Sequence, residues 1–148
     1  MRLTLDSNVL VYALDANTPD KHRVARRLMV RAAEADAVLT VQAMAEFLSV
    51  IRRRYPEYLE EALAQAERWS VEFAPIPTLW THVTAAVQLA QRHRLQLWDC
   101  VIWQVARSNG ASIFVSEDLQ DGFSAGGMTV LDPFNPANAD KLARLLEK

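Results

Sequence analysis

The stretch LTLDSNVLVYAL, residues 3–14, decides the fold. Its first three residues form a short apolar and β-branched run, which is typical of a strand. Asp6, Ser7 and Asn8 are residue types that often cap helices, and the apolar run 9–14 follows them directly. We therefore predict a strand, a turn and a helix in immediate succession, with Asp6 at the carboxyl end of the strand.

Strand-like and helix-like segments alternate along the rest of the chain. Helices are expected at residues 19–35, 42–54, 57–73, 79–93 (with Thr78 as its cap), 97–108 and 136–148, and strands at residues 37–41, 112–116 and 128–131. Apolar strands interleaved with helices favour right-handed crossovers and a parallel sheet that is covered on both faces. The pattern therefore predicts an α/β fold, a three-layer α/β/α sandwich.

Composition limits the class of protein. Of the 148 residues, 51% are hydrophobic and 23% are charged, which suits a single domain spanning residues 1–148. Cys100 is the only cysteine, which excludes an internal disulfide and makes a reducing, cytoplasmic compartment the expected one. Apolar runs are too short for a membrane span. The net charge of −2 means that any bound polyanion must be held by local charges.

Three carboxylates occupy positions where a carboxylate is unexpected. Asp6 ends the first strand, where parallel sheets bind ligands, although a helix cap is an alternative role. Glu46 lies in an otherwise uncharged part of its helix, and it could simply mark the solvent edge. Asp99 lies in an apolar segment with no Lys or Arg within a helical turn, so a cation or a capping role is needed to explain it.

A fourth acidic position follows the strand predicted at residues 112–116. The turn there contains Glu117, Asp118 and Asp121. Two carboxylates about 5 Å apart repel by roughly 3 kcal/mol at an effective dielectric constant near 20, so converging acids require protonation or a divalent cation. An oxygen-only ligand set favours Mg²⁺ or Mn²⁺ over zinc. The chemistry that this site indicates is metal-assisted hydrolysis of phosphodiesters.

With these acids in this order, the chain resembles the PIN-domain nucleases, and among them the small VapC-type toxins of toxin–antitoxin systems. The resemblance extends over LDSNVLVYALD (residues 5–15), LWDCVIWQVARSNG (97–110) and FVSEDLQDG (114–122). It implies a four- or five-stranded, mainly parallel sheet. It also implies a Mg²⁺- or Mn²⁺-dependent endoribonuclease, the toxin of a type II pair, which acts on RNA as a homodimer and is silenced by a cognate antitoxin.

The resemblance also implies roles for individual residues. By position, the acidic pocket that holds one or two metal ions comprises Asp6, Glu46, Asp99 and Asp118. Ser116 matches a small hydroxyl position that steadies this pocket, and Asn8 is expected to order the Asp6 loop. Asp121 is a candidate for an additional or water-mediated metal ligand, whereas Glu117 is expected to face solvent.

Two further groups of residues allow both a structural and a functional interpretation. Arg52, Arg53 and Arg54 end the helix that carries Glu46, where they either contact RNA phosphates or complement the helix dipole. Trp98 and Trp103 are expected in the core rather than as platforms for stacked bases.

Two rival functions stay open at this stage. A catalytically silent PIN fold would bind RNA or protein without turnover. A phosphatase with an Asp nucleophile after its first strand is compatible with Asp6. That chemistry normally needs a second Asp two residues later, where this chain has Asn8.

Overall fold

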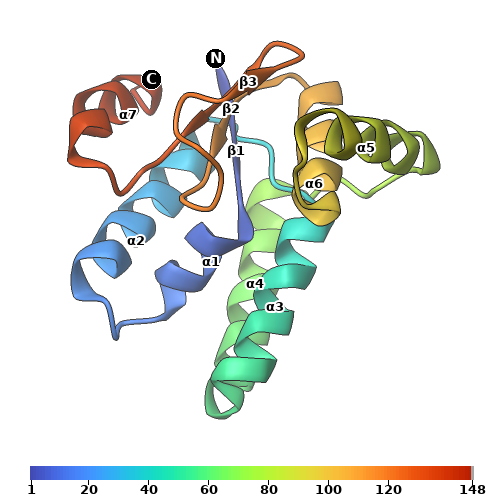
Figure 1. Cartoon of the computed structure of the whole chain (residues 1–148). Coiled ribbons are helices and arrows are strands. Elements are labelled where there is room, and N and C mark those ends of the chain that lie inside the picture. The colour runs from blue at the N-terminus through green and yellow to red at the C-terminus, as the bar shows by residue number, and fades with distance from the viewer. Residues whose placement is uncertain (148) are drawn as a thin grey trace.

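A computed structural model describes residues 1–147 and contains a four-stranded sheet in the order β1-β2-β4-β3 (Figure 1). Its strands are β1 (Arg2–Leu5), β2 (Ala111–Val115), β3 (Ser124–Ala125) and β4 (Met128–Leu131). Strands β1, β2 and β4 are parallel, and β3 pairs antiparallel with β4. The sheet confirms the predicted α/β fold with a mainly parallel sheet.

The register of the parallel strands determines where the polar residues beyond them lie. Leu5 pairs with Val115, and Val115 pairs with Leu131, so the three carboxyl ends are level. The ladder continues for one more residue, because the N–H of Asp6 donates to the carbonyl of Val115 (3.0 Å) and that of Ser116 to Leu131 (3.1 Å). Asp6 and Ser116 are therefore neighbours at one edge of the sheet.

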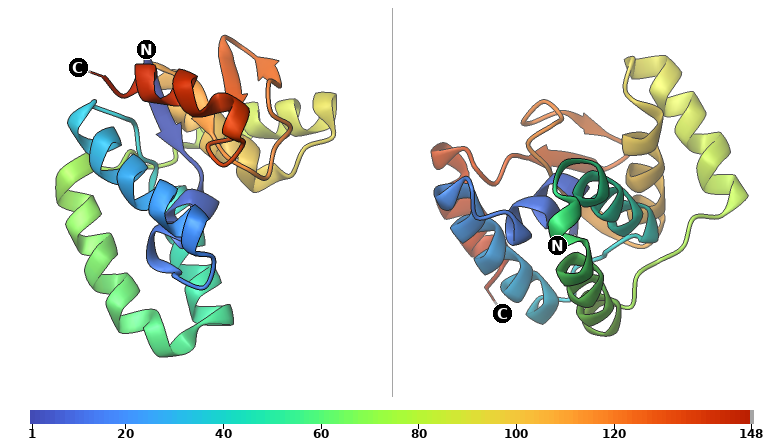
Figure 2. Two further views of the ribbon diagram at one scale, coloured as in Figure 1. Left: turned by 90° about the vertical axis from the view of Figure 1, so that its left-hand side faces the viewer. Right: turned by 90° about the horizontal axis from the view of Figure 1, so that it is seen from below.

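Helices lie on both sides of this sheet, with α2 and α7 on one side and α5 and α6 on the other (Figure 1). Their bounds are α1 (Ser7–Leu14), α2 (Pro19–Glu34), α3 (Val41–Arg54), α4 (Leu59–Phe73), α5 (Trp80–His93), α6 (Leu97–Ser108) and α7 (Ala139–Leu145), with 3₁₀ turns at Pro56–Tyr58 and Pro136–Asn138. Helices α3 and α4 form an antiparallel hairpin that projects away from the sheet (Figure 2). Within residues 1–147, no helix is both long and apolar enough to cross a membrane.

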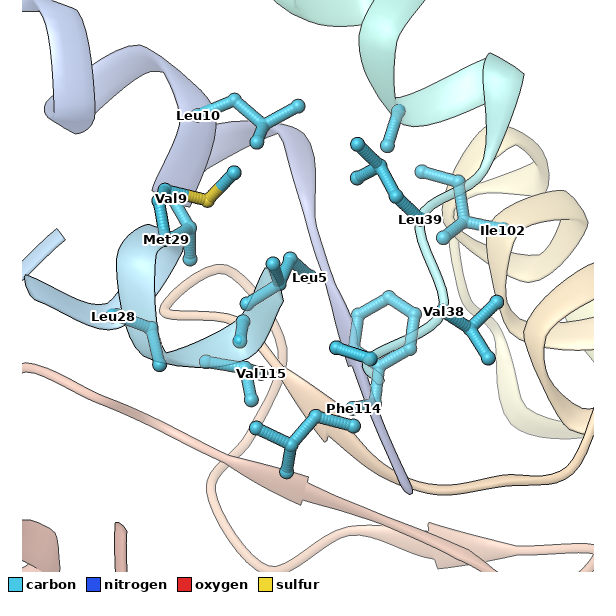
Figure 3. Close-up of a cluster of buried hydrophobic side chains, with 14 of the residues drawn as sticks. Leu5, Val9, Leu10, Leu28, Met29, Val38, Leu39, Ile102, Phe114 and Val115 are labelled. Atoms are coloured by element: carbon cyan, nitrogen blue, oxygen red, sulfur yellow. The ribbon is translucent and has the colours of Figure 1, made fainter. Parts of the chain in front are cut away.

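The main core lies between the sheet and the helices that cover it. Leu5 of β1, Val9 of α1, Leu28 of α2 and Val115 of β2 meet in one cluster (Figure 3). On the α6 side, the ring of Trp103 packs 5.1 Å from that of Phe114 and is almost fully buried. Burial of these apolar side chains is what fixes α1 and α6 against the strand ends.

The segment predicted as a strand at residues 37–41 forms only isolated bridges. Val38 bridges to Thr4, and its N–H donates to the carbonyl of Leu3 (2.7 Å). The hydroxyl of Thr40 then accepts a hydrogen bond from the N–H of Ala43 (3.0 Å), so the chain already turns into α3. The N-cap of this helix therefore ends the strand before a ladder can form.

Other boundaries differ from the prediction for local reasons. The short strand β3 was not predicted; it forms because Gly126 and Gly127 adopt φ of +59° and +85° and close a tight hairpin into β4. Helix α5 is capped at Leu79 and not at Thr78, because the ring nitrogen Nδ1 of His82 accepts the N–H of Leu79. Helix α7 is shorter than predicted, and Lys148 lies outside the described residues.

The packing of Trp103 makes a quantitative prediction about stability. Trp103→Ala should lower the free energy of unfolding by about 3–5 kcal/mol, because it leaves a cavity between α6 and the sheet. Trp80→Ala is the matched control, since this indole is 76% exposed, and its effect should stay within about 0.5 kcal/mol. Urea denaturation of both variants measures the difference, and equal effects would contradict the packing described.

Candidate active site

The Asp6 carboxylate is held in one orientation where β1 meets α1. Asp6 is the N-cap of α1, and its Oδ1 accepts a hydrogen bond from the N–H of Ser7 (2.8 Å). Its Oδ2 accepts from the hydroxyl of Ser116 (2.7 Å) and from the amide of Asn8 (3.3 Å). All three polar side chains are buried. The carboxylate is therefore fixed by hydrogen-bond donors without being paired with a cation.

Asn8 and Ser116 connect the ends of β1 and β2. The Asn8 amide donates to the Ser116 hydroxyl (3.0 Å), and the Asn8 carbonyl oxygen accepts from the N–H of Glu117 (3.4 Å). The Ser116 hydroxyl also accepts from the N–H of Asp118 (3.1 Å). This network ties the loop that carries Asp118 to the loop that carries Asp6.

Helices α3 and α6 contact each other and bring two more acids to the same place. Glu46 lies in the middle of α3, and its Oε2 is buried without a hydrogen-bond partner. Asp99 lies in the first turn of α6 and is half-buried. Among residues 1–147, no Lys, Arg or His forms an ion pair with any of the four acids Asp6, Glu46, Asp99 and Asp118.

The pKa values of three of these carboxyl groups are raised, first by burial and then by the charges of neighbouring acids. Burial, followed by the charge of Asp99, raises the pKa of Asp6 to about 7. Burial, followed by the charges of the other three acids, raises the pKa of Glu46 to about 7. Burial and the charge of Asp118 raise the pKa of Asp99 to about 6. The charges of Asp6, Asp99 and Asp118 thus make ionisation of neighbouring carboxyl groups more costly.

A cleft of about 850 Å³ opens beside this acidic cluster. One wall is a single face of α3, because its lining residues recur at helical spacing from Gln42 through Glu46 to Arg53. Arg54 also lines the cleft, whereas Arg52 does not. Of the four acids, Glu46 on this wall and Asp118 in the loop after β2 line the cleft, and the arginines lie at the C-terminal end of α3.

Trp98 lines the cleft, contrary to the expectation that it belongs to the core. Its side chain is 51% exposed, whereas Trp103, five residues further along α6, is 1% exposed. Helical spacing does not distinguish the two, because α6 is apolar on more than one side and packs against both the sheet and α5. The sequence expectation is correct for Trp103 and wrong for Trp98.

Two acids of the turn after β2 are engaged elsewhere. The Asp121 carboxylate accepts hydrogen bonds from the N–H of Asp132 (3.0 Å) and from the amides of Asn135 (3.3 Å) and Asn138 (3.0 Å). Burial acts to raise the pKa of Asp121, but these hydrogen bonds outweigh it and lower the pKa. Asp121 thus fastens the C-terminal loop and does not line the cleft.

Glu117 does not face solvent as expected. Its carboxylate forms an ion pair with Lys21 of α2 (2.6 Å), and its side chain is only 20% exposed. The Lys21 ammonium also lies over the rings of Tyr12 and Phe134. Because the charge of Glu117 is already neutralised, this residue contributes little to the excess negative charge of the cleft.

The donor set of the acidic cluster fits a hard divalent cation. The donors are carboxylate oxygens, which Mg²⁺ and Mn²⁺ prefer, and the orphaned Oε2 of Glu46 lacks any other partner. As they stand, no three His, Cys, Asp or Glu side chains within residues 1–147 form a group that could hold a metal ion. A cation bound at this cluster would therefore draw the carboxylates closer together or be held partly through water.

The raised pKa values predict how stability depends on pH. A carboxyl group with a raised pKa stabilises the fold below its unfolded pKa near 4, and this contribution disappears as the pH rises through 6 to 7. In the presence of a chelator, the free energy of unfolding should therefore fall by on the order of a few kcal/mol between about pH 5 and pH 8. Glu46→Gln should show a smaller loss. Urea denaturation at both pH values measures this, and identical losses in the two proteins would refute the coupling.

Comparison with known proteins agrees with this geometry. Residues 3–124 match the PIN domain family, which is well over half of the chain. No curated protein matches the chain. PIN domains are in general metal-dependent nucleases. The matched region includes both strand ends, the α3 and α6 acids and the turn after β2, so this chain belongs to the PIN domain family.

Proposed function

We propose that this protein is a Mg²⁺- or Mn²⁺-dependent endoribonuclease that hydrolyses RNA phosphodiester bonds. The catalytic and metal-binding residues in this proposal are Asp6, Glu46, Asp99 and Asp118. The observation that carries it is the convergence of four carboxylates, without a cationic partner among the described residues, beside a cleft of about 850 Å³. Membership of the PIN domain family supports it independently.

The residues of the site have distinct tasks in this proposal. Asp6 presents a carboxylate whose orientation is set by Ser116 and Asn8. Glu46 and Asp99 supply oxygens from two helices, and Asp118 supplies one from the loop after β2. A bound divalent cation would lower the pKa of an attacking water and stabilise charge that develops on the phosphate. Hydrolysis in this way leaves a 5′-phosphate and a 3′-hydroxyl.

The part of the cleft at the C-terminal end of α3 offers positive charges for the phosphates of a nucleic acid strand. Arg53 lies seven residues after Glu46 on the same face of α3, which corresponds to about 10 Å along the helix axis. Arg53 and Arg54 form no ion pair within the described residues, so their guanidinium groups are available to phosphates that flank the scissile bond. The volume lies within the roughly 300–1,000 Å³ that is typical of ligand pockets, so the cleft can hold a segment of a few nucleotides.

We further propose that the nuclease is the toxin of a type II toxin–antitoxin pair. The support is the VapC-like character of residues 5–15, 97–110 and 114–122. The proposal includes action in the cytoplasm as a homodimer and inhibition by a cognate antitoxin protein. The silent binding module remains the main competing function, and it shares the fold but predicts no turnover.

Replacing Asp99 tests the proposed chemistry. Asp99→Asn should abolish cleavage of RNA, because one carboxylate needed for the cation is lost. Its metal-free form should be at least as stable as the wild type, because repulsion from Asp118 is relieved. Cleavage of a structured RNA with Mn²⁺ or with a chelator, together with thermal melting, measures both effects.

Glu72→Gln on the exposed surface of α4 is the matched control for this experiment, since it removes one carboxylate outside the cleft. This variant should cleave RNA as the wild type does. Equal cleavage by Asp99→Asn and the wild type would refute the assignment. Failure of the wild type to cleave any RNA with either cation would favour the silent binding module.

The toxin role predicts a cellular phenotype. Induced expression of the wild-type chain alone should slow bacterial growth, because RNA is cleaved without an inhibitor present. Asp99→Asn expressed at the same level should not slow growth. Growth curves with matched immunoblots measure this, and equal growth of the two strains would contradict the toxin proposal.

A further inference from the structure

Trp98 is the exposed aromatic side chain beside the acidic cluster. It directly precedes Asp99 in the first turn of α6, and successive side chains on a helix point about 100° apart. The two side chains therefore point in different directions: the indole of Trp98 lines the cleft, 51% exposed, whereas Asp99 is half-buried and within reach of the charge of Asp118. Trp98 thus adjoins one of the four acids in sequence and shares the cleft with two others, Glu46 and Asp118.

The surroundings of Trp98 differ from those of the buried tryptophans. Trp69 packs on the ring of Phe47, and Trp103 packs on those of Phe114 and Phe123. Within residues 1–147, no ring pair includes Trp98. An indole left half-exposed beside a polar cleft gains little from packing, so its presence there calls for a ligand with a flat apolar face.

The other walls of the cleft restrict the chemistry of such a ligand. The α3 wall of the same cleft carries Glu46 at its middle and Arg53 near its end, with Arg54 beside it. A ligand that meets all three features contains phosphates for the arginines and for the cation-binding acids, and a planar ring for the indole. A nucleotide chain with an unstacked base meets these requirements, whereas a simple polyanion does not.

We propose that Trp98 is a stacking platform for one unpaired base next to the phosphodiester held at the acids, so that the substrate is single-stranded at this point. The inference rests on the proposed nuclease function and adds the residue that would contact a base beside the acids. Every base has a π-face, so stacking here tolerates many sequences but rejects a paired duplex. A duplex must first unstack and unpair a base at a cost of a few kcal/mol.

Binding measurements in a cleavage-deficient background test the platform. The background is Glu46→Gln, and the probe is a fluorescently labelled, non-self-complementary single-stranded RNA in Mn²⁺ buffer. Adding Trp98→Ala should weaken binding roughly tenfold, whereas Trp98→Phe should stay within about threefold of the background. Trp80→Ala removes an exposed indole outside the cleft and should leave binding unchanged.

A second probe separates stacking from a general structural effect. This probe is the same ribose-phosphate chain with the bases omitted. In the protein that retains Trp98, affinity for the chain without bases should be much lower than affinity for the complete RNA. In the Trp98→Ala protein this difference should be much smaller. The four affinities form a thermodynamic cycle that measures the coupling between Trp98 and the bases. The slope of affinity against salt should fall in Arg53→Gln and stay constant in Trp98→Ala. Equal loss on base removal with and without Trp98, or unchanged RNA binding by Trp98→Ala, would overturn the platform.

These outcomes are distinguishable from failure of the nuclease proposal. If wild-type protein cleaves RNA but the cycle shows no coupling, the platform is wrong and the nuclease stands. If the coupling is present but wild-type protein cleaves nothing, the platform stands on an RNA-binding module and the nuclease is wrong.

Discussion

Mutual repulsion among four carboxylates is the constraint on which the site depends. Asp6, Glu46, Asp99 and Asp118 come from a strand end, two helices and a loop, yet the charges of Asp6, Asp99 and Asp118 each raise the cost of ionising at least one other member of the group. A protein that maintains such a cluster without a cationic partner must either keep it partly protonated or bind a cation. The group of four acids therefore indicates a cation site, whereas a single carboxylate on the surface would not.

The fold holds Asp6, the most buried of the four acids, at a fixed position at the end of β1. The level ends of β1 and β2 place Ser116 beside Asp6, and the Ser116 hydroxyl donates one hydrogen bond to Asp6 while accepting two, from the Asn8 amide and the N–H of Asp118. Pairing of the strands, packing of α1 and the Asn8 contacts all act on the same few atoms. Helices α3 and α6 carry Glu46 and Asp99, the acids that accompany Asp6. The site therefore forms only when the sheet and both helices are in place.

Apolar spacing and isolated charges in the sequence predict most of the helices and strands and two of the acids. They do not predict features that depend on contacts between distant segments. The strand, turn and helix at residues 3–14 and the helix at residues 97–108 follow from apolar spacing, because those segments pack as their periodicity requires. The uncharged surroundings of Glu46 and Asp99 identify two of the acids, since a lone charge in an apolar segment needs a partner.

Packing between distant segments accounts for what the sequence does not predict. The exposure of Trp98 depends on how α6 packs against the rest of the fold, and this cannot be inferred from helical spacing. Asp121 and Glu117 lie in the same acidic turn as Asp118, but their partners are Asn135, Asn138 and Lys21, which are remote in sequence. No local signal indicates these pairings.

Anomalous diffraction from crystals soaked in Mn²⁺ tests most directly whether the four acids bind a divalent cation. We predict an anomalous peak bounded by carboxylate oxygens of Asp6, Asp99 and Glu46 or Asp118, with the carboxylates closer together than in the metal-free protein. A well-ordered cleft that contains no anomalous peak at millimolar Mn²⁺, or a peak only at unrelated surface carboxylates, would contradict the account.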